Sequence, residues 1–250
     1  NLTRRIARAA APLEGYSVVE VGPGPGGLTR ALLSEGAEKV VAIERDRRAI
    51  PALNEIAAAF PNHLIIIAED ALTTNWRNIA GGGVKIKVVA NLPYNIATLL
   101  LTRWLTAEPW PPWYESMTLM FQKEVADRLI AAPGSKAYGR LSVLAQWRSK
   151  AVRLFDVDRR AFTPPPKVTS SVVQITPSEP CLKNCLATNL ERVTAHAFGQ
   201  RRKMLRSSLK GLCADSGGLL RVAGIDPSLR AEQLAVADFC RLAVALPISC

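Results

Sequence analysis

The residues best suited to bind a cofactor begin with the glycine-rich stretch Glu20-Val21-Gly22-Pro23-Gly24-Pro25-Gly26-Gly27. Glycine permits a tight turn and lets a ligand approach the backbone closely, although a glycine cluster alone is equally typical of an ordinary turn. The spacing here, acidic-x-Gly-x-Gly-x-Gly, differs from the dinucleotide pattern Gly-x-Gly-x-x-Gly. No Lys-Ser/Thr pair follows, as it would in a nucleoside-triphosphate loop. We therefore favour S-adenosylmethionine over NAD as the ligand of Glu20, Gly22, Gly24 and Gly26.

Two further acidic residues stand at the ends of β-type runs. Glu44 ends the run 39–44, 22 residues after Gly22, and a carboxylate there can accept two hydrogen bonds from ribose hydroxyls. Asp70 follows the run 64–68 and is placed, with Ala71 beside it, to meet an adenine amino group. Each acid alone is more often a surface residue. Acidic side chains at three successive strand ends together predict a nucleoside cofactor.

The tetrapeptide Asn91-Leu92-Pro93-Tyr94 follows the next β-type run, where an open α/β sheet binds its ligands. The N6 lone pair of adenine is delocalised into the ring, so this nitrogen is a poor nucleophile. The Asn91 side-chain oxygen and the Leu92 carbonyl can accept its two N–H bonds. Pro93 fixes the local backbone, and Tyr94 offers a face for base stacking. These residues predict amine methylation, with Asn91 also near the cofactor; alternatively, the tetrapeptide is only the start of a helix.

A second unusual segment is Phe162-Thr163-Pro164-Pro165-Pro166-Lys167-Val168. A proline run is stiff and extended. Phe162, held by this rigid segment, could stack on the other face of a flipped base. The alternative is a rigid linker between strands with Phe162 in the core.

The elements that must position these residues alternate between β-type runs and helical patterns, which indicates a parallel sheet with crossover helices. The alternation of β-type and helical patterns ends at residues 177–180, and only helical patterns follow. We predict an α/β fold, a doubly wound Rossmann-like sheet of residues 1–176, with a small all-helical domain at 177–250. The predicted strands are 16–21, 39–44, 64–68, 85–90, 117–121, 151–157 and 168–175, and the predicted helices are 28–34, 50–59, 96–105, 123–131, 182–198, 201–212 and 236–246.

The net charge of +11 lies in two segments. Residues 136–167 hold eight basic and two acidic side chains, and residues 201–210 hold five basic ones, so the rest of the chain is neutral. A charge run is usually a solvated face, but an excess this segregated favours a polyanionic partner. No hydrophobic insertion face accompanies it, which argues against a membrane surface. We expect RNA contacts from Arg140, Lys167, Arg201, Arg202, Lys203, Arg206 and Lys210.

Scarce residues exclude other classes of site. The chain has two histidines, His63 and His196, so a His-rich metal centre is excluded. Five cysteines form no secreted disulfide framework, and Cys181-x-x-x-Cys185 lacks the second pair of a zinc finger. We expect free thiols in a reducing cytoplasm and no metal. The 48% of hydrophobic residues suffices for a large core, and no signal-peptide core or membrane span is evident.

The combined motifs closely resemble the ribosomal RNA adenine N6-dimethyltransferases, specifically the bacterial small-subunit (16S) type associated with kasugamycin sensitivity. The resemblance spans nearly the whole chain. The segments that carry it are Val18–Gly27, Ala90–Ile96, Phe121–Arg128, Ser135–Gln146, Ala161–Val173, Ala197–Leu209 and Ile225–Leu234.

The resemblance implies an S-adenosylmethionine-dependent transfer of two methyl groups to each of two adjacent adenines. These adenines lie in a hairpin near the 3′ end of small-subunit rRNA, in an assembling subunit. By position, Gly22, Glu44, Asp70 and Asn91 match the family's cofactor contacts, and Asn91–Tyr94 and Phe162 its target-base residues. The family also has an upstream Gln-Asn/His-Phe-Leu segment that closes over the cofactor. Without that segment we expect the printed chain to bind the cofactor poorly or to be inactive.

Three alternatives stay open. The related large-subunit rRNA methyltransferase that confers macrolide resistance is the nearest, although the proline run and residues 225–234 favour the small-subunit type. DNA or protein amide methyltransferases use a related Asn/Asp-Pro-Pro-Tyr motif, but position 92 is Leu. A non-enzymatic role in ribosome assembly or transcription belongs to a different class, and the intact Asn91–Tyr94 motif argues against it. We expect a cytoplasmic monomer.

Overall fold

The computed structural model describes residues 2–79, 83–162 and 165–247, which form two compact units. The first unit comprises Asn1–Ala126 and Ala151–Pro177, and the second comprises Asp127–Lys150 and Ser178–Cys250. The chain passes from one unit to the other after residues 126, 150 and 177, and the last of these points lies next to the predicted boundary. The predicted first domain, however, also included residues 127–150. They belong to the second unit because Tyr138, Val143, Leu144 and Trp147 are buried in its core.

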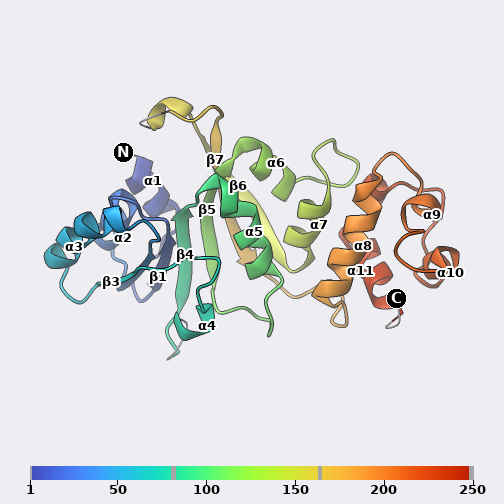
Figure 1. Cartoon of the computed structure of the whole chain (residues 1–250), viewed down its shortest axis with the longest axis horizontal. Helices are drawn as coiled ribbons and strands as arrows, with labels where there is room; N and C mark the ends of the chain where they lie inside the picture. Colours follow the sequence, from blue (N-terminus) through green and yellow to red (C-terminus); the bar gives the residue numbers. More distant parts are fainter. Residues whose placement is uncertain (1, 80–82, 163–164, 248–250) are drawn as a thin grey trace. The chain divides into compact units, whose positions relative to one another are not determined.

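A seven-stranded sheet of order β3-β2-β1-β4-β5-β7-β6 forms the centre of the first unit (Figure 1). Strands β1 to β5 run parallel to one another, and β7 runs antiparallel to its neighbour β5. All seven predicted strands are confirmed to within two residues at each end. Their bounds are β1 Ser17–Val21, β2 Lys39–Ile43, β3 Leu64–Ile67, β4 Ile86–Asn91, β5 Ser116–Gln122, β6 Ser149–Val157 and β7 Ser170–Pro177.

Helices cover both faces of this sheet, because its central strands are apolar on both sides. Val18, Val40 and Val89 share one core cluster with residues of α1 (Leu2–Ala9), α2 (Gly27–Ser34) and α3 (Ile50–Ala59). Val19, Val88 and Leu119 are equally buried but alternate to the opposite face. Helix α5 (Tyr94–Leu105) crosses from β4 to β5 and contacts β5, and the short α4 (Trp76–Ile79) precedes β4. This is the predicted doubly wound architecture.

The strand order reverses between β1 and β4, which are neighbours in the sheet. In an open α/β sheet a ligand binds outside the carboxyl ends of the strands at such a switch point. The glycine loop follows β1, and Asn91 is the last residue of β4. The topology therefore brings the two motifs of the sequence to one edge of the sheet.

The opposite end of β4 anchors α1. Lys87 is buried, and its Nζ donates to the carbonyl oxygens of Ala10 at 3.0 Å and Pro12 at 2.7 Å, directly after the helix. The same Nζ lies 4.2 Å from the centre of the Tyr16 ring. Burial lowers the pKa of Lys87. A buried ammonium needs such partners, so it ties the end of α1 to the sheet.

The second unit is helical, as predicted. Its core combines Tyr138 and Trp147 with Leu190 and Phe239, and Phe198 stacks on Phe239 with 5.4 Å between ring centres. In the described part of the chain no helix is long and apolar enough to cross a membrane. The helices after β5 are α6 Lys123–Leu129, α7 Arg140–Trp147, α8 Ala187–Gly199, α9 Leu205–Ser208, α10 Ser216–Val222 and α11 Val236–Ala245. The 3₁₀ turns along the chain are η1 Arg47–Ala49, η2 Arg159–Ala161 and η3 Ala231–Gln233.

Two predicted helices of this unit are shorter in the structure. The predicted helix 182–198 begins only at Ala187, after the extended residue Leu186. The predicted helix 201–212 is reduced to α9, because Met204 is extended and forms a β-bridge with Arg230. Helices α1, α4, α7 and α10 were not among the predicted helices.

Candidate active site

The glycine loop turns with three residues in the left-handed region: φ is 68° at Gly22, 54° at Gly24 and 83° at Gly26. Such values favour glycine. A Cβ on Gly26 would overlap the Ile56 side chain of α3, so this glycine lets the loop pack on the helix. A Cβ on Gly24 would meet nothing within 4 Å. Gly24 therefore faces open space at the carboxyl end of β1, where a ligand can lie against the backbone.

Glu20 lies beneath this loop with an exposed fraction of 1%. Thr29 of α2 donates its hydroxyl to Glu20 Oε2 at 2.6 Å. Burial raises the pKa of Glu20 to about 8; the Thr29 hydrogen bond opposes this rise, and the nearby Glu44 carboxylate adds to it. Glu20 thus connects β1 to α2. Its direct contact with the cofactor stays a prediction.

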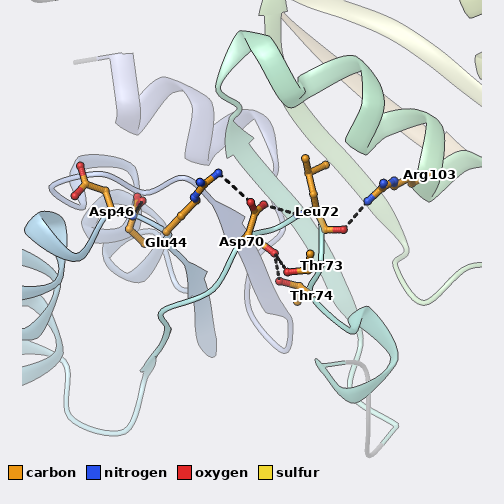
Figure 2. A network of polar contacts seen from close by, with 8 residues as sticks. Glu44, Asp46, Asp70, Leu72, Thr73, Thr74 and Arg103 are labelled. Carbon is orange, nitrogen blue, oxygen red and sulfur yellow. Dashed lines mark hydrogen bonds and ion pairs between the residues drawn. The ribbon is translucent and has the colours of Figure 1, made fainter.

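Glu44 joins the glycine loop to the turn after β2. It is 8% exposed, and its Oε2 accepts a hydrogen bond from the Gly24 amide at 3.0 Å. Its Oε1 accepts from the Asp46 amide at 2.7 Å. Figure 2 shows Glu44 beside Asp46, on the turn that follows β2. Two strands of the sheet are therefore coupled through the side chain predicted to bind the ribose.

Asp70 lies at the carboxyl end of the next strand and is partly exposed. Its Oδ1 accepts from the Leu72 amide at 2.9 Å, and its Oδ2 pairs with Arg45 Nη1 at 3.0 Å. Ala71 is buried beside it. Glu44 and Asp70 thus stand at the ends of adjacent strands, as Figure 2 shows. The two carboxylates predicted to contact the ribose and the adenine therefore lie after neighbouring strands.

The Asn91–Tyr94 tetrapeptide meets the glycine loop. Asn91 is exposed at the end of β4, whereas Leu92 is buried. A Cβ on Gly22 would lie 3.2 Å from Pro93 Cδ, so the absence of a side chain at Gly22 permits this close approach. Tyr94 is half-buried, and its hydroxyl forms a 2.6 Å hydrogen bond with Ser170 Oγ of β7. The tetrapeptide therefore packs against the glycine loop through Pro93 and is tied to β7 through Tyr94.

Phe162 directly follows η2 and is half-buried against the core cluster of α1 to α3. It lies in the same unit as the tetrapeptide. Part of its contact surface is thus in the core, as one reading of the sequence held. Its stacking on a base stays a prediction. Thr163 and Pro164, the first residues of the stiff segment, lie outside the described residues.

Comparison with known proteins decides the family. The family model described as ribosomal RNA adenine dimethylase matches residues 1–246. The chain belongs to this ribosomal RNA adenine dimethylase family. The predicted resemblance is confirmed. So is the enzyme class, an rRNA adenine dimethyltransferase with S-adenosylmethionine as its cofactor.

Individual relatives agree with this assignment. The chain is 61% identical over 244 residues to a protein of Xanthobacter autotrophicus called ribosomal RNA small subunit methyltransferase A, covering 97% of this chain and 84% of the relative. A protein of the same name from Rhodopseudomonas palustris is 59% identical over 246 residues, covering 97% of this chain and 84% of the relative.

Solved structures show the same fold. A dimethyladenosine transferase from Plasmodium falciparum aligns with a TM-score of 0.78 and 26% identity, covering 96% of this chain and 93% of that chain. The 23S rRNA methyltransferase ErmE aligns with a TM-score of 0.70 and 25% identity, covering 98% of this chain and 96% of that chain.

The site of this rRNA adenine dimethylase suits its cofactor. The open side of Gly24 leaves room beside the backbone, and the carboxylates of Glu44 and Asp70 follow in line. Among the described residues no group of three or more His, Cys, Asp or Glu side chains could hold a metal ion. Cys181, Cys185, Cys213 and Cys240 are free thiols, and Cys250 lies outside the described residues.

The basic residues predicted to bind RNA fall into two groups. Arg140 pairs with Glu191 at 3.3 Å, and Arg201 pairs with Glu232 at 2.8 Å while donating to the Ser135 carbonyl at 3.2 Å. These two hold the second unit together. The others are exposed and, within the described residues, form no ion pair; they are Lys167, Arg202, Lys203, Arg206 and Lys210.

Several site residues were missed by the sequence reading. Thr29 is the third residue of α2, and a helix entering directly from a strand could have suggested that it faces back to Glu20. Arg45 follows Glu44 and could have been noted for its charge. Arg103 and Ser170 are distant in sequence from their partners, and no local pattern indicates them.

Proposed function

We propose that this enzyme transfers two methyl groups to N6 of each of two adjacent adenines in a hairpin near the 3′ end of small-subunit rRNA. The observation that carries the proposal is the close approach of Pro93 to Gly22, because it brings the tetrapeptide that begins with Asn91 against the glycine loop. The relatives that are 61% and 59% identical and named small-subunit methyltransferases support this choice of rRNA.

The first unit would hold the cofactor along the ends of three strands. Gly22, Gly24 and Gly26 would cradle its methionine part, Glu44 would accept hydrogen bonds from the ribose, and Asp70 with Ala71 would meet the adenine. Glu20 would stabilise the glycine loop through its hydrogen bond with Thr29 of α2. When bound, S-adenosylmethionine supplies an activated methyl group on a sulfonium.

The target adenine would be held by the tetrapeptide. The Asn91 side-chain oxygen and the Leu92 carbonyl accept the two N6–H bonds, which draws the nitrogen lone pair out of conjugation with the ring. The Tyr94 ring stacks on the base, and its hydrogen bond to Ser170 limits how far that ring can rotate. Phe162 covers the other face. Proximity, in-line orientation and exclusion of water supply the rate enhancement.

The exposed basic side chains of both units would attract the phosphates of the substrate RNA. Arg202, Lys203, Arg206 and Lys210 carry no ion pair in the described structure, so their charges are available to phosphates. Lys167 belongs to the segment of the proposed base pocket. The partner is an assembling small ribosomal subunit, and we infer that the enzyme acts in the cytoplasm as a monomer.

The second candidate is methylation of large-subunit rRNA, since the structure of the 23S enzyme ErmE resembles this chain over its whole length. A direct test supplies full-length protein and methyl-labelled S-adenosylmethionine to small and large subunits that lack the modifications. We expect label in the small subunit, released by nuclease digestion as dimethyladenosine. Label confined to the large subunit would favour the second candidate, and no dimethyladenosine from either would reject both.

An assembly role can accompany catalysis. A variant that lacks turnover but still restores subunit maturation in cells would show that binding contributes independently of methyl transfer. Loss of maturation in that variant would mean that methylation itself is required.

A further inference from the structure

The turn that carries Asp70 is held together by hydrogen bonds that reach beyond its own residues (Figure 2). Within this Asp70–Thr74 turn, the Leu72 amide donates to Asp70 Oδ1 at 2.9 Å. The hydroxyls of Thr73 and Thr74 both donate to the Asp70 carbonyl at 3.0 Å. The position of the Asp70 carboxylate therefore depends on where the backbone of Leu72 lies.

Two arginines from other elements hold this turn. Arg45, after β2, pairs with Asp70 Oδ2 at 3.0 Å. Arg103, near the end of α5, donates through Nη1 to the carbonyl oxygen of Leu72. In Figure 2 the Arg103 side chain points from its helix toward Leu72, on the side of the turn away from Glu44. Leu72 is thus the link between Arg103 and Asp70: its carbonyl accepts from one, and its amide donates to the other.

Core packing does not replace these bonds, because the turn borders a cavity. A cavity of about 660 Å³ is lined by Leu72 and Thr74 from the turn, by Arg103 and Trp104 from α5, and by Trp113. A segment with empty space on one side can shift at little cost in packing contacts. The charge-assisted hydrogen bond from Arg103 is then a main restraint on Leu72.

Helix α5 also begins with Tyr94, nine residues before Arg103. One rigid element therefore starts at the proposed target-base motif and ends at the support of the proposed adenine pocket.

We propose that Arg103 is a positioning residue for cofactor recognition: by fixing the Leu72 carbonyl, it holds Asp70 in place to accept the 6-amino group of the cofactor's adenine. This rests on the proposed function, specifically on the assignment of Asp70. Arg103 touches neither substrate. Its effect is on the choice between adenine and other purines, which no sequence motif of the chain indicated.

The test compares two ligands that differ only in the 6-amino group, S-adenosylhomocysteine and its 6-deamino analogue with hydrogen at the purine 6-position, by equilibrium binding to the full-length protein. Arg103→Met keeps an unbranched side chain of about the length of the arginine stem and removes the guanidinium donors. We expect binding of the adenosine ligand to weaken about three- to tenfold, the range for loss of one charge-assisted hydrogen bond at a partly exposed site. Binding of the 6-deamino ligand, which lacks the amino group, should change less than twofold. Equal weakening for both ligands would overturn the proposal.

Two further variants keep the outcome interpretable. Arg103→Lys retains a donor and should recover part of the discrimination, whereas a failure to recover any would count against the hydrogen bond. Arg30→Met removes an exposed arginine from α2, away from the turn, and should leave both affinities unchanged. A large effect of Arg30→Met would mean that loss of charge alone explains the Arg103 result.

A double-mutant cycle separates this proposal from the function on which it rests. Asp70→Asn should itself weaken binding of the adenosine ligand. In the Asp70→Asn background Arg103→Met should cause little further loss of affinity, since both substitutions act through one carboxylate. Additive effects would overturn the role of Arg103 alone. No effect of Asp70→Asn on either ligand would overturn the assignment of Asp70 as well.

Discussion

At the scale of single residues, the site relies on acids used in different ways. Asp70 is partly exposed and Glu44 keeps 8% of its surface exposed, whereas Glu20 is enclosed and bonded to Thr29. A carboxyl with a pKa of about 8 is protonated at neutral pH and carries no charge. The acidic position that opens the glycine motif thus acts here as a neutral link between β1 and α2.

Glu20→Gln should change how stability depends on pH. The native protein holds the Glu20 proton up to about pH 8, whereas the unfolded chain releases it near the ordinary value of 4.5. The unfolded state therefore binds fewer protons in this window. This group therefore lowers the free energy of unfolding by about 1.4 kcal/mol for each unit that the pH rises within this window. Glutamine mimics the protonated acid and does not titrate. The free energy of unfolding of the variant, relative to that of the wild type, should therefore increase from pH 5 to pH 8.

Chemical denaturation at several pH values measures this difference. Parallel stability curves for the two proteins would contradict a raised pKa of Glu20. Thr29→Val offers a matched variant, because it removes the hydroxyl donor without touching the carboxyl.

Much of the site follows from the sequence, for a physical reason. Glycine spacing, strand-end acids and the Asn91–Tyr94 tetrapeptide are local patterns, and a parallel sheet necessarily brings strand ends together. The Glu20 burial, the Arg103 bond and the Ser170 bond depend on which elements pack side by side. Single-sequence periodicity carries no such information.

At the scale of elements, buried polar links tie helices to the sheet. Lys87 bonds the end of α1 to β4, and the Tyr94–Ser170 bond joins α5 to β7. The strands were predicted well because apolar runs and turns are local signals. Helix α9 was overpredicted because a basic, helix-favouring segment is interrupted by the pairing of Met204 with Arg230, a contact distant in sequence.

Lys87→Met should loosen α1 and leave the sheet intact. The variant leaves the Ala10 and Pro12 carbonyls without their buried donor, which costs about 1–3 kcal/mol. We expect a lower free energy of unfolding and faster amide exchange in α1 than in β4. Lys150→Met, at an exposed lysine of β6, is the control and should change neither. Unaltered exchange in α1 of the Lys87 variant would argue against the anchoring role.

At the scale of the whole molecule, basic side chains occur in both units, whereas the proposed cofactor and target-base residues all belong to the first unit. The net charge of +11 was a general indication of a polyanion. The structure divides its carriers into paired side chains such as Arg201 and exposed ones such as Arg202 and Lys203. The sequence treated these as one cluster, since ion pairs such as Arg201–Glu232 form only in the folded unit.

Replacing Arg202, Lys203 and Arg206 together by alanine should weaken RNA binding across sequences. The slope of log affinity against log salt should fall by about 2–3, because up to three phosphate contacts are lost. Cofactor affinity should be unchanged. Arg201→Ala should instead lower the stability of the second unit, through loss of the Glu232 and Ser135 bonds. Binding titrations over a salt series check this, and an unchanged slope in the triple variant would refute the role.

The central claim is that Asn91 presents an adenine of small-subunit rRNA to the methyl donor. The most direct measurement is mass spectrometry of nuclease fragments from undermodified small subunits after reaction with wild type or Asn91→Ala protein, alongside cofactor affinity. We predict two methyl groups on each of two adjacent adenines with the wild type. Asn91→Ala should give no detectable methylation, with cofactor binding within a few-fold of wild type. Full methylation by Asn91→Ala, or methyl groups on other bases, would contradict the account.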